Sequence, residues 1–139
     1  MQITGIVCKI IIFLFNVTFI NNHADNQGGA IGIDGGILIC NNTRFIDSYA
    51  EDGPSILVMD SELKLYNSYI TSKELVKISQ IYLTPGTEAY IENTTFANIT
   101  SSYAPAIYIT SSKASIINSK FMDLKADITA GAIATKEGG

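Results

Sequence analysis

Apolar residues alternate with polar ones in short runs along the chain, and these runs recur at a nearly constant spacing. Isoleucine opens one such run five times, at Ile31, Ile56, Ile81, Ile107 and Ile133. Because successive side chains of a strand point to opposite faces, each run predicts a short β-strand with one apolar face. The nearly constant interval predicts that the same strand returns once per structural repeat.

An asparagine followed shortly by an aromatic residue provides a second landmark with the same period. Four copies place phenylalanine three residues after asparagine, and the third copy in chain order is a shortened version that ends in tyrosine. The pairs are Asn16 and Phe19, Asn42 and Phe45, Asn67 and Tyr69, Asn93 and Phe96, and Asn118 and Phe121. This alignment predicts that Tyr69 occupies the same structural position as the four phenylalanines.

A further alternating pair precedes each asparagine, so that every repeat holds three apolar stations. These pairs are Ile12 and Leu14, Leu38 and Cys40, Leu63 and Leu65, Ala89 and Ile91, and Ala114 and Ile116. One coil of three short strands cannot bury its apolar side chains alone, whereas stacked coils shield one another. We therefore expect an all-β fold: a parallel β-helix (solenoid) of about five coils with three short strands per coil, right-handed because crossover connections favour that hand.

A chain of 139 residues is expected to form one domain, so residues 1–139 are read as a single β-helix segment. Ile6 and Cys8 precede Ile31 and Ile33 by one repeat period, which predicts the third strand of an earlier coil. Both ends would leave an uncovered strand edge, so we expect a fragment of a longer solenoid or a subunit within one. The run at 10–15 is alternatively the apolar part of a signal peptide, and it is too short to span a bilayer.

Two tetrapeptides of the first repeat carry a family resemblance. Residues 19–22 read FINN and residues 28–31 read GGAI, while later copies such as FIDS and GPSI keep only part of each motif. The chain resembles the repeats of chlamydial polymorphic outer-membrane proteins, and similar repeats occur in pectin-lyase-like β-helices and in large surface proteins of protists. The resemblance covers nearly the whole chain. It implies a β-helix that is extracellular or displayed at the cell surface and is often adhesive.

Charge and composition exclude several classes of partner. The net charge is −4, and the nine basic residues form no cationic run, so we expect neither nucleic-acid binding nor adsorption to anionic membranes. A hydrophobic content of 47% with 16% charged residues is typical of a folded core. The two cysteines, Cys8 and Cys40, lie within apolar alternation and are expected to be buried thiols.

Chemistry-bearing residues are sparse. Polysaccharide hydrolysis needs two converging carboxylates, and lyase action needs an acidic cation site beside a base. The only histidine is His23, and Glu51 with Asp52 is the only adjacent acidic pair. We therefore expect a non-enzymatic surface scaffold or adhesin segment, without a cofactor, that binds protein or glycan. The alternatives are the non-catalytic part of a polysaccharide-active, pectin-lyase-like enzyme, and a subunit of an extracellular filament whose open ends bind copies of itself.

One acidic position recurs six residues after the aromatic landmark. Asp25, Glu51 and Asp127 occupy it, and Ser102 interrupts the row. Asp25 and Glu51 would lie on adjacent coils and repel each other, which a divalent cation would offset. The alternative is a solvated turn whose carboxylates point apart.

The asparagine column suggests two further roles. Stacked amides at Asn16, Asn42, Asn67, Asn93 and Asn118 are expected to form a hydrogen-bonded ladder. Four asparagines also stand in N-glycosylation sequons: Asn16, Asn41, Asn93 and Asn98. Burial within the ladder would exclude a glycan from Asn16 and Asn93. We therefore expect Asn41, which points away from Cys40, to be glycosylated first.

Outward-facing aromatic and aliphatic positions are the remaining candidates for binding. On the strand before each asparagine they are Phe13, Phe15, Ile39, Tyr66, Tyr90 and Ile117, and on the third strand they are Tyr82 and Tyr108. Such patches stack on sugars, bury a protein partner or are covered by a neighbouring chain.

Overall fold

The computed structural model describes residues 9–137, which form β-strands joined by turns and contain no helix. The strands are β1 (Ile11–Phe15), β2 (Thr18–Ile20), β3 (Ile31–Asn41), β4 (Arg44–Ile46), β5 (Ile56–Tyr66), β6 (Tyr69–Thr71), β7 (Ile81–Leu83), β8 (Glu88–Glu92), β9 (Thr95–Ser101), β10 (Ile107–Thr110), β11 (Lys113–Ile117), β12 (Lys120–Ala126) and β13 (Ile133–Lys136). All strand pairs are parallel.

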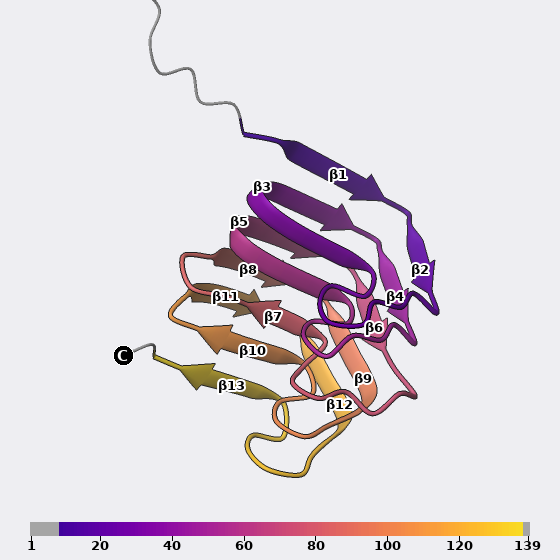
Figure 1. The fold of residues 1–139 in the computed structure, drawn as a ribbon. Coiled ribbons are helices and arrows are strands. Elements are labelled where there is room, and N and C mark those ends of the chain that lie inside the picture. The colour runs from indigo at the N-terminus through magenta and orange to yellow at the C-terminus, as the bar shows by residue number, and fades with distance from the viewer. Residues whose placement is uncertain (1–8, 138–139) are drawn as a thin grey trace, which may run out of the picture.

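The strands wind around one axis as a right-handed coil of about five turns (Figure 1). Each turn passes through three walls. The first wall contains β1, residues 37–41 of β3, residues 62–66 of β5, β8 and β11. The second wall is the five-stranded sheet β12-β9-β6-β4-β2. The third wall contains residues 31–34 of β3, residues 56–59 of β5, β7, β10 and β13. The predicted fold class is confirmed.

The third strand of one coil and the first strand of the next are not always separate. They fuse into the 11-residue strands β3 and β5, which bend at Gly35 and Asp60, both at positive φ. The first and third walls therefore belong to one sheet. In the following coil Pro85 and Gly86 separate β7 from β8. Proline has no N–H to donate to a ladder, and Gly86 has a φ of 83°, so this stretch turns instead of continuing the strand.

The isoleucine landmark stacks in register from coil to coil. Ile31 pairs with Ile56, which pairs with Ile81, and the ladder continues through Ile107 to Ile133. The alternating pairs of the first wall stack in the same way, and the core buries Leu38, Cys40, Leu63, Leu65 and Ile91 completely. The largest fully buried side chains are Phe45, Phe96, Leu38, Ile56, Leu57, Leu63, Leu65, Ile70, Ile81, Leu83, Ile91 and Ile99. The sequence period is thus the period of the core.

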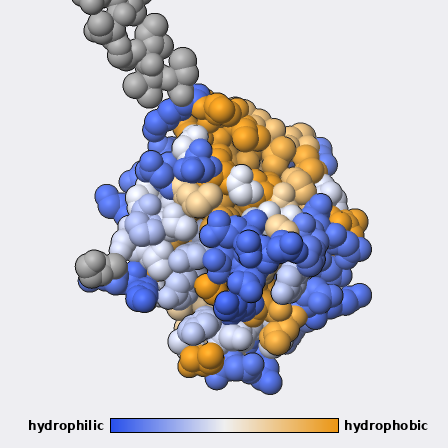
Figure 2. All heavy atoms as spheres, in the orientation of Figure 1, coloured by the Kyte–Doolittle hydropathy of each residue, from blue (hydrophilic) through white to orange (hydrophobic). Residues whose placement is uncertain are grey.

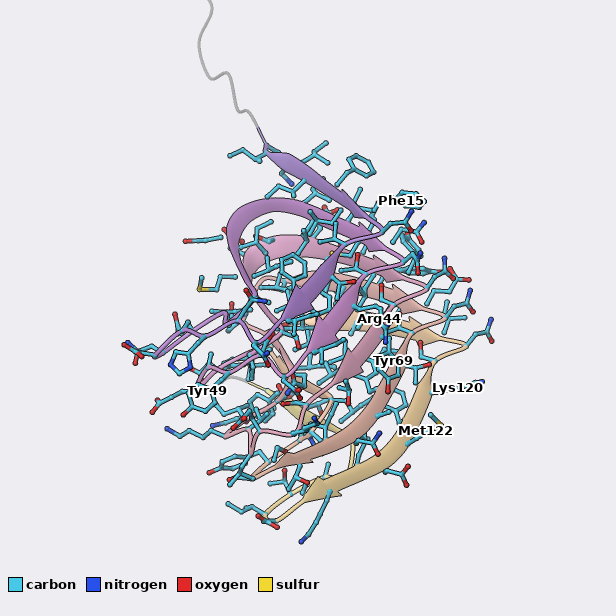
Figure 3. All side chains as sticks on the ribbon, turned by 90° about the vertical axis from the view of Figure 1, so that its right-hand side faces the viewer. Phe15, Arg44, Tyr49, Tyr69, Lys120 and Met122 are labelled. Carbon is cyan, nitrogen blue, oxygen red and sulfur yellow. The ribbon has the colours of Figure 1, made fainter. Side chains whose placement is uncertain are left out.

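The predicted aromatic column is confirmed for four of its five members. Phe19 stacks on Phe45 with ring centroids 5.1 Å apart, and Phe96 stacks on Phe121 at 5.1 Å. The prediction for Tyr69 is wrong, because Ile70 pairs with Phe45 above and Phe96 below. Tyr69 instead pairs with Arg44 on the outer surface, where the guanidinium carbon lies 5.6 Å from the ring centroid (Figure 3).

The glycine pair of the GGAI motif allows two coils to approach closely. A Cβ atom on Gly29 would lie 2.4 Å from the carbonyl oxygen of Tyr49 and 2.6 Å from that of Pro54. Both oxygens belong to the next coil, and the neighbouring Ala30 N–H donates to the Pro54 carbonyl at 2.8 Å. A side chain at position 29 would push the coils apart.

Two further expectations concern the cysteines and the membrane. Cys40 is a buried free thiol, as predicted, and burial raises its pKa to about 12. Ile6 and Cys8 lie outside the described residues.

Among residues 9–137 there is no helix with the length and apolar character needed to cross a membrane.

Candidate functional site

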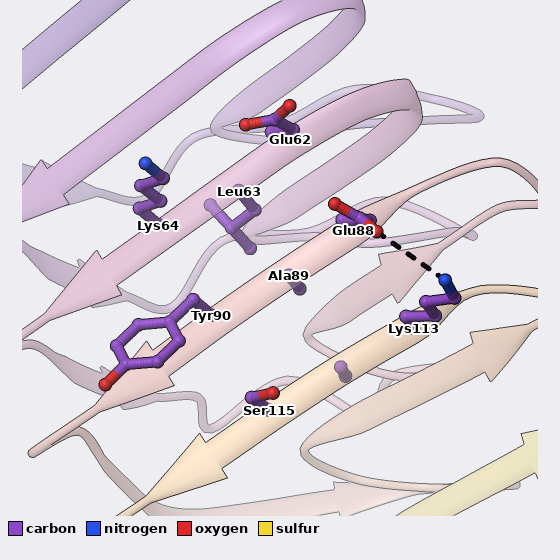
Figure 4. Close-up of a pocket in the computed structure, with 9 residues that line it drawn as sticks. Glu62, Leu63, Lys64, Glu88, Ala89, Tyr90, Lys113 and Ser115 are labelled. Atoms are coloured by element: carbon purple, nitrogen blue, oxygen red, sulfur yellow. Dashed lines mark ion pairs between the residues drawn. The ribbon is translucent and has the colours of Figure 1, made fainter.

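The first wall presents one outward side chain at every second position. On β5, β8 and β11 several of these outward side chains are charged. Register places Glu62 beside Glu88 and Glu88 beside Lys113, with Lys64, Tyr90 and Ser115 in the neighbouring column. We call these six residues the charged face. They line a shallow pocket of about 280 Å³ (Figure 4). Glu88 Oε1 lies 3.9 Å from Lys113 Nζ, and their side chains are 65% and 87% exposed. The pocket therefore holds solvated charges.

Tyr90 of the charged face has a second tyrosine, Tyr66, beside it. The ring centroids of Tyr66 and Tyr90 are 5.7 Å apart, on adjacent coils. The Tyr90 hydroxyl donates to Glu92 Oε2 at 3.3 Å. Desolvation, together with the Glu92 carboxylate, raises the pKa of the Tyr90 phenol. Tyr90 is thus a half-buried ring that its hydrogen bond to Glu92 orients.

The upper coil of the same wall is apolar. Its outward side chains, Ile11, Phe13 and Phe15, are 54%, 72% and 67% exposed. We call these three residues the apolar face. In Figure 2 hydrophobic residues gather at the top of the molecule, where β1 lies in Figure 1. The two faces lie on one wall and differ completely in chemistry.

The third wall carries a second tyrosine pair. Tyr82 and Tyr108 are register neighbours with ring centroids 5.4 Å apart in an edge-to-face arrangement. Together with Tyr103, Ile78, Lys77 and Lys136 they line a shallow pocket of about 290 Å³, which we call the tyrosine pocket. Sequence patterns identified Tyr82 and Tyr108 and missed the other four residues. A usable signal exists, since Lys77 and Tyr103 are separated by one coil period.

The asparagine column is a partial ladder. Asn42 donates to Asn16, and Asn93 Nδ2 donates to Asn67 Oδ1 at 3.3 Å. Asn67 Nδ2 donates instead to Asn41 Oδ1 at 3.0 Å. No hydrogen bond joins the side chain of Asn118 to another described residue. All five column residues have φ between 48° and 56° and are exposed, because the left-handed turn directs their side chains outward.

Because the column asparagines are exposed, burial no longer argues that Asn41 is glycosylated before the other sequon asparagines. Asn16, Asn93 and Asn98 are exposed, whereas Asn41 is half-buried and accepts the hydrogen bond from Asn67. Asn98 has a φ of 55°, and its side chain has no hydrogen-bond partner among the described residues. Glycosylation of these asparagines stays a prediction, and by exposure Asn98 now precedes Asn41.

The acidic row consists of carboxylates with separate partners. Asp25 Oδ1 lies 3.3 Å from His23 Nε2, and Glu51 Oε2 lies 3.4 Å from Lys77 Nζ. Asp127 lies 4.0 Å from Lys125 Nζ. Within residues 9–137 no group of three or more His, Cys, Asp or Glu side chains is placed to hold a metal ion. The cation hypothesis for Asp25 and Glu51 stays a prediction.

The turns after the second wall contain an arrangement that the sequence motifs did not reveal. The His23 ring stacks on the Tyr49 ring of the next coil at 4.9 Å, with Asn21, Asp47 and Glu74 around the same shallow pocket. Asn21 and Asp47 both have positive φ, as do Asn98 and Asp123, and each stands two residues after its phenylalanine. The pattern Phe-x-Asn/Asp, present in four of the five repeats, is therefore more regular than the FINN tetrapeptide.

In comparisons with protein-family models, curated proteins and solved structures, no significant match to this chain is found.

Proposed function

We propose that this chain is a non-enzymatic β-helix scaffold, located outside the cell or at its surface, whose walls bind a glycan or protein partner. The observation that carries the proposal is the repeated display of tyrosine pairs on a rigid stack. Tyr66 and Tyr90 lie on the first wall, and Tyr82 and Tyr108 lie on the third. Tyrosine combines an apolar ring with a polar tip, which suits both sugar stacking and protein interfaces.

The assignment to the repeat class of chlamydial polymorphic outer-membrane proteins belongs to the same proposal. FINN and GGAI support it, and the close approach at Gly29 gives the second motif a physical reason. The surface location follows from that resemblance.

Array binding tests the proposal. The intact chain is applied to arrays of glycans and of extracellular proteins, together with the double variants Y66A/Y90A and Y82A/Y108A. Tyr69→Ala on the second wall is the matched control. We expect binding to at least one ligand, lost in one double variant and retained in Y69A. Absence of any binding, or binding that both double variants retain in full, contradicts the proposal.

A segment of a polysaccharide-active protein is the second candidate, and one observation favours it. Glu62 and Glu88 are register neighbours on adjacent coils, beside Lys64 and Lys113. Paired carboxylates carry out glycoside hydrolysis, and a lysine serves as a base in elimination. Incubation with neutral and acidic polysaccharides, followed by assays for new reducing ends and unsaturated products, separates the two candidates. Product formed by the wild type and lost in both E62Q and E88Q establishes catalysis by this segment; no product removes Glu62 and Glu88 as catalytic residues.

A further inference from the structure

The tyrosine pocket combines aromatic rings, unpaired hydroxyls and positive charge. Tyr82, Tyr103 and Tyr108 supply three phenols, and none of their hydroxyls hydrogen-bonds to another described residue. Ile78 adds an apolar contact, and Lys77 and Lys136 supply the charges. The pocket has no acidic lining residue among those that the structure describes. Its surface therefore offers stacking, hydrogen bonding and attraction for an anion together.

Two of the pocket's tyrosines belong to one outward column of the third wall. In register from coil to coil this column reads Leu57, Tyr82, Tyr108 and Ala134. Leu57 is buried, whereas Ala134, the register neighbour of Tyr108, is a small half-buried residue. Lys136 lies two residues further along β13, on the same outward side as Ala134. Tyr82 and Tyr108 thus line one pocket together with the Lys136 side chain.

The loops around the pocket are held by hydrogen bonds between coils. Ala104 N–H donates to the Ile78 carbonyl at 3.0 Å, and Ile128 N–H donates to the Ser102 carbonyl at 2.8 Å. The Thr129 hydroxyl donates to the carbonyl of Tyr103 at 2.9 Å. Side chains on such a supported backbone lose little freedom when a ligand binds.

The two lysines differ in their availability. Lys77 already pairs with Glu51 at 3.4 Å. Lys136 is exposed and forms no ion pair with another described residue. Lysine is a compact charge with three rotatable donors and imposes no planar geometry on its partner, whereas the planar fork of arginine matches carboxylate and phosphate groups alike. The pocket offers four separate donor groups, which are the hydroxyls of its three tyrosines and the Lys136 ammonium. A sulfate group has three terminal oxygens to accept from them, whereas a carboxylate has two.

We infer that the tyrosine pocket binds a sulfated saccharide, with the sugar ring against Tyr82 and Tyr108 and the sulfate group at Lys136. This inference rests on the proposed function and names the ligand class of one of its two tyrosine walls. The pocket volume of about 290 Å³ suits one sugar unit, so longer chains would extend along the third wall beyond it.

Calorimetric titration with a dextran sulfate tetrasaccharide tests the inference. Unsulfated dextran and a tetragalacturonate of equal length are the comparison ligands. We expect binding of the sulfated ligand only, weakened about tenfold when salt rises from about 50 mM to about 0.5 M. Lys136→Gln should weaken binding about fivefold, and Tyr108→Ala about tenfold. Lys120→Gln and Tyr69→Ala on the second wall are the matched controls and should leave the affinity unchanged.

Each other outcome overturns the inference. Equal losses in K120Q and K136Q indicate general attraction of a polyanion. Equal affinity for tetragalacturonate removes the preference for sulfate, and no binding of dextran sulfate removes the site. Because K136Q changes only an exposed side chain, its result does not depend on the folding of Y108A. If dextran sulfate fails while the arrays still show binding that requires Tyr66 and Tyr90, the proposed function stands and this inference alone is wrong.

Discussion

The first wall contains two outer surfaces above one continuous core. Phe13 and Phe15 project from its upper coil, whereas Glu62, Glu88 and Lys113 project from its lower coils. The inward residues of the same strands are all aliphatic or small, and they stack without a change of register. The outer chemistry therefore changes while the inner ladder stays constant. Inward positions determine that the chain forms a β-helix, and outward positions are free to differ in what they bind.

The largest effect should come from comparing the same side chain on the two sides of the coil. Phe45 is fully buried between Phe19 and Ile70, whereas Phe15 is 67% exposed. We expect Phe45→Ala to lower the free energy of unfolding by about 3–5 kcal/mol, because it leaves a cavity in the core. Phe15→Ala should change it by less than about 0.5 kcal/mol. Denaturant titrations followed by circular dichroism measure both. Equal losses would show that the apolar face contributes to the fold.

The inward-facing core residues could be predicted well from the sequence because they recur at a constant spacing. Counting residues was enough to predict the isoleucine ladder. The error at Tyr69 came from following residue type instead of spacing. Ile70 stands three residues after Asn67, as each phenylalanine follows its asparagine, and it is the residue in the column. The core accepts any apolar side chain of suitable size at that position.

The candidate sites were harder to predict because they depend on loop shape and on side-chain direction. Lys77 and Tyr103 come from turns whose path the alternating pattern does not determine. The asparagine column was read correctly as a column, but its backbone is left-handed, and its side chains point into solvent. Composition cannot show that direction, which is why the ranking of the sequons changed.

A backbone contact should give the next largest effect. Gly29→Ala would place a methyl group against two carbonyl oxygens of the next coil, at 2.4 and 2.6 Å. We expect a loss of about 2–3 kcal/mol in the free energy of unfolding, because the backbone oxygens cannot move aside freely. Gly131→Ala is the control, since no described atom lies within 4 Å of the added carbon. Thermal and denaturant unfolding of both variants measure the difference. An unchanged G29A would mean that the coils separate at little cost.

The asparagine column should contribute less than the core and more than the outer charges. Asn67→Ala loses the hydrogen bonds to Asn41 and Asn93. It also places alanine at a φ of 49°, a left-handed conformation that asparagine tolerates better than alanine. We expect a loss of about 1–2 kcal/mol in the free energy of unfolding. Asn67→Gly keeps the left-handed turn at lower strain and should lose less. If glycine were as destabilising as alanine, the hydrogen bonds alone, and not the turn conformation, would account for the role of Asn67.

The smallest effect should come from the charged face, and this prediction completes the comparison. Glu88 and Lys113 are 3.9 Å apart with most of their side chains in water, so their attraction is screened and opposed by side-chain entropy. Glu88→Gln, Lys113→Gln and the double variant should each alter the free energy of unfolding by less than about 0.5 kcal/mol, with coupling in the same range. Unfolding midpoints at low and high salt provide the measurement. A loss above about 1 kcal/mol in either single variant would mean that outer residues also hold the coils together. If the effect is small, any change in binding or turnover in E88Q or K113Q reports on the surface alone, because the core beneath them is intact.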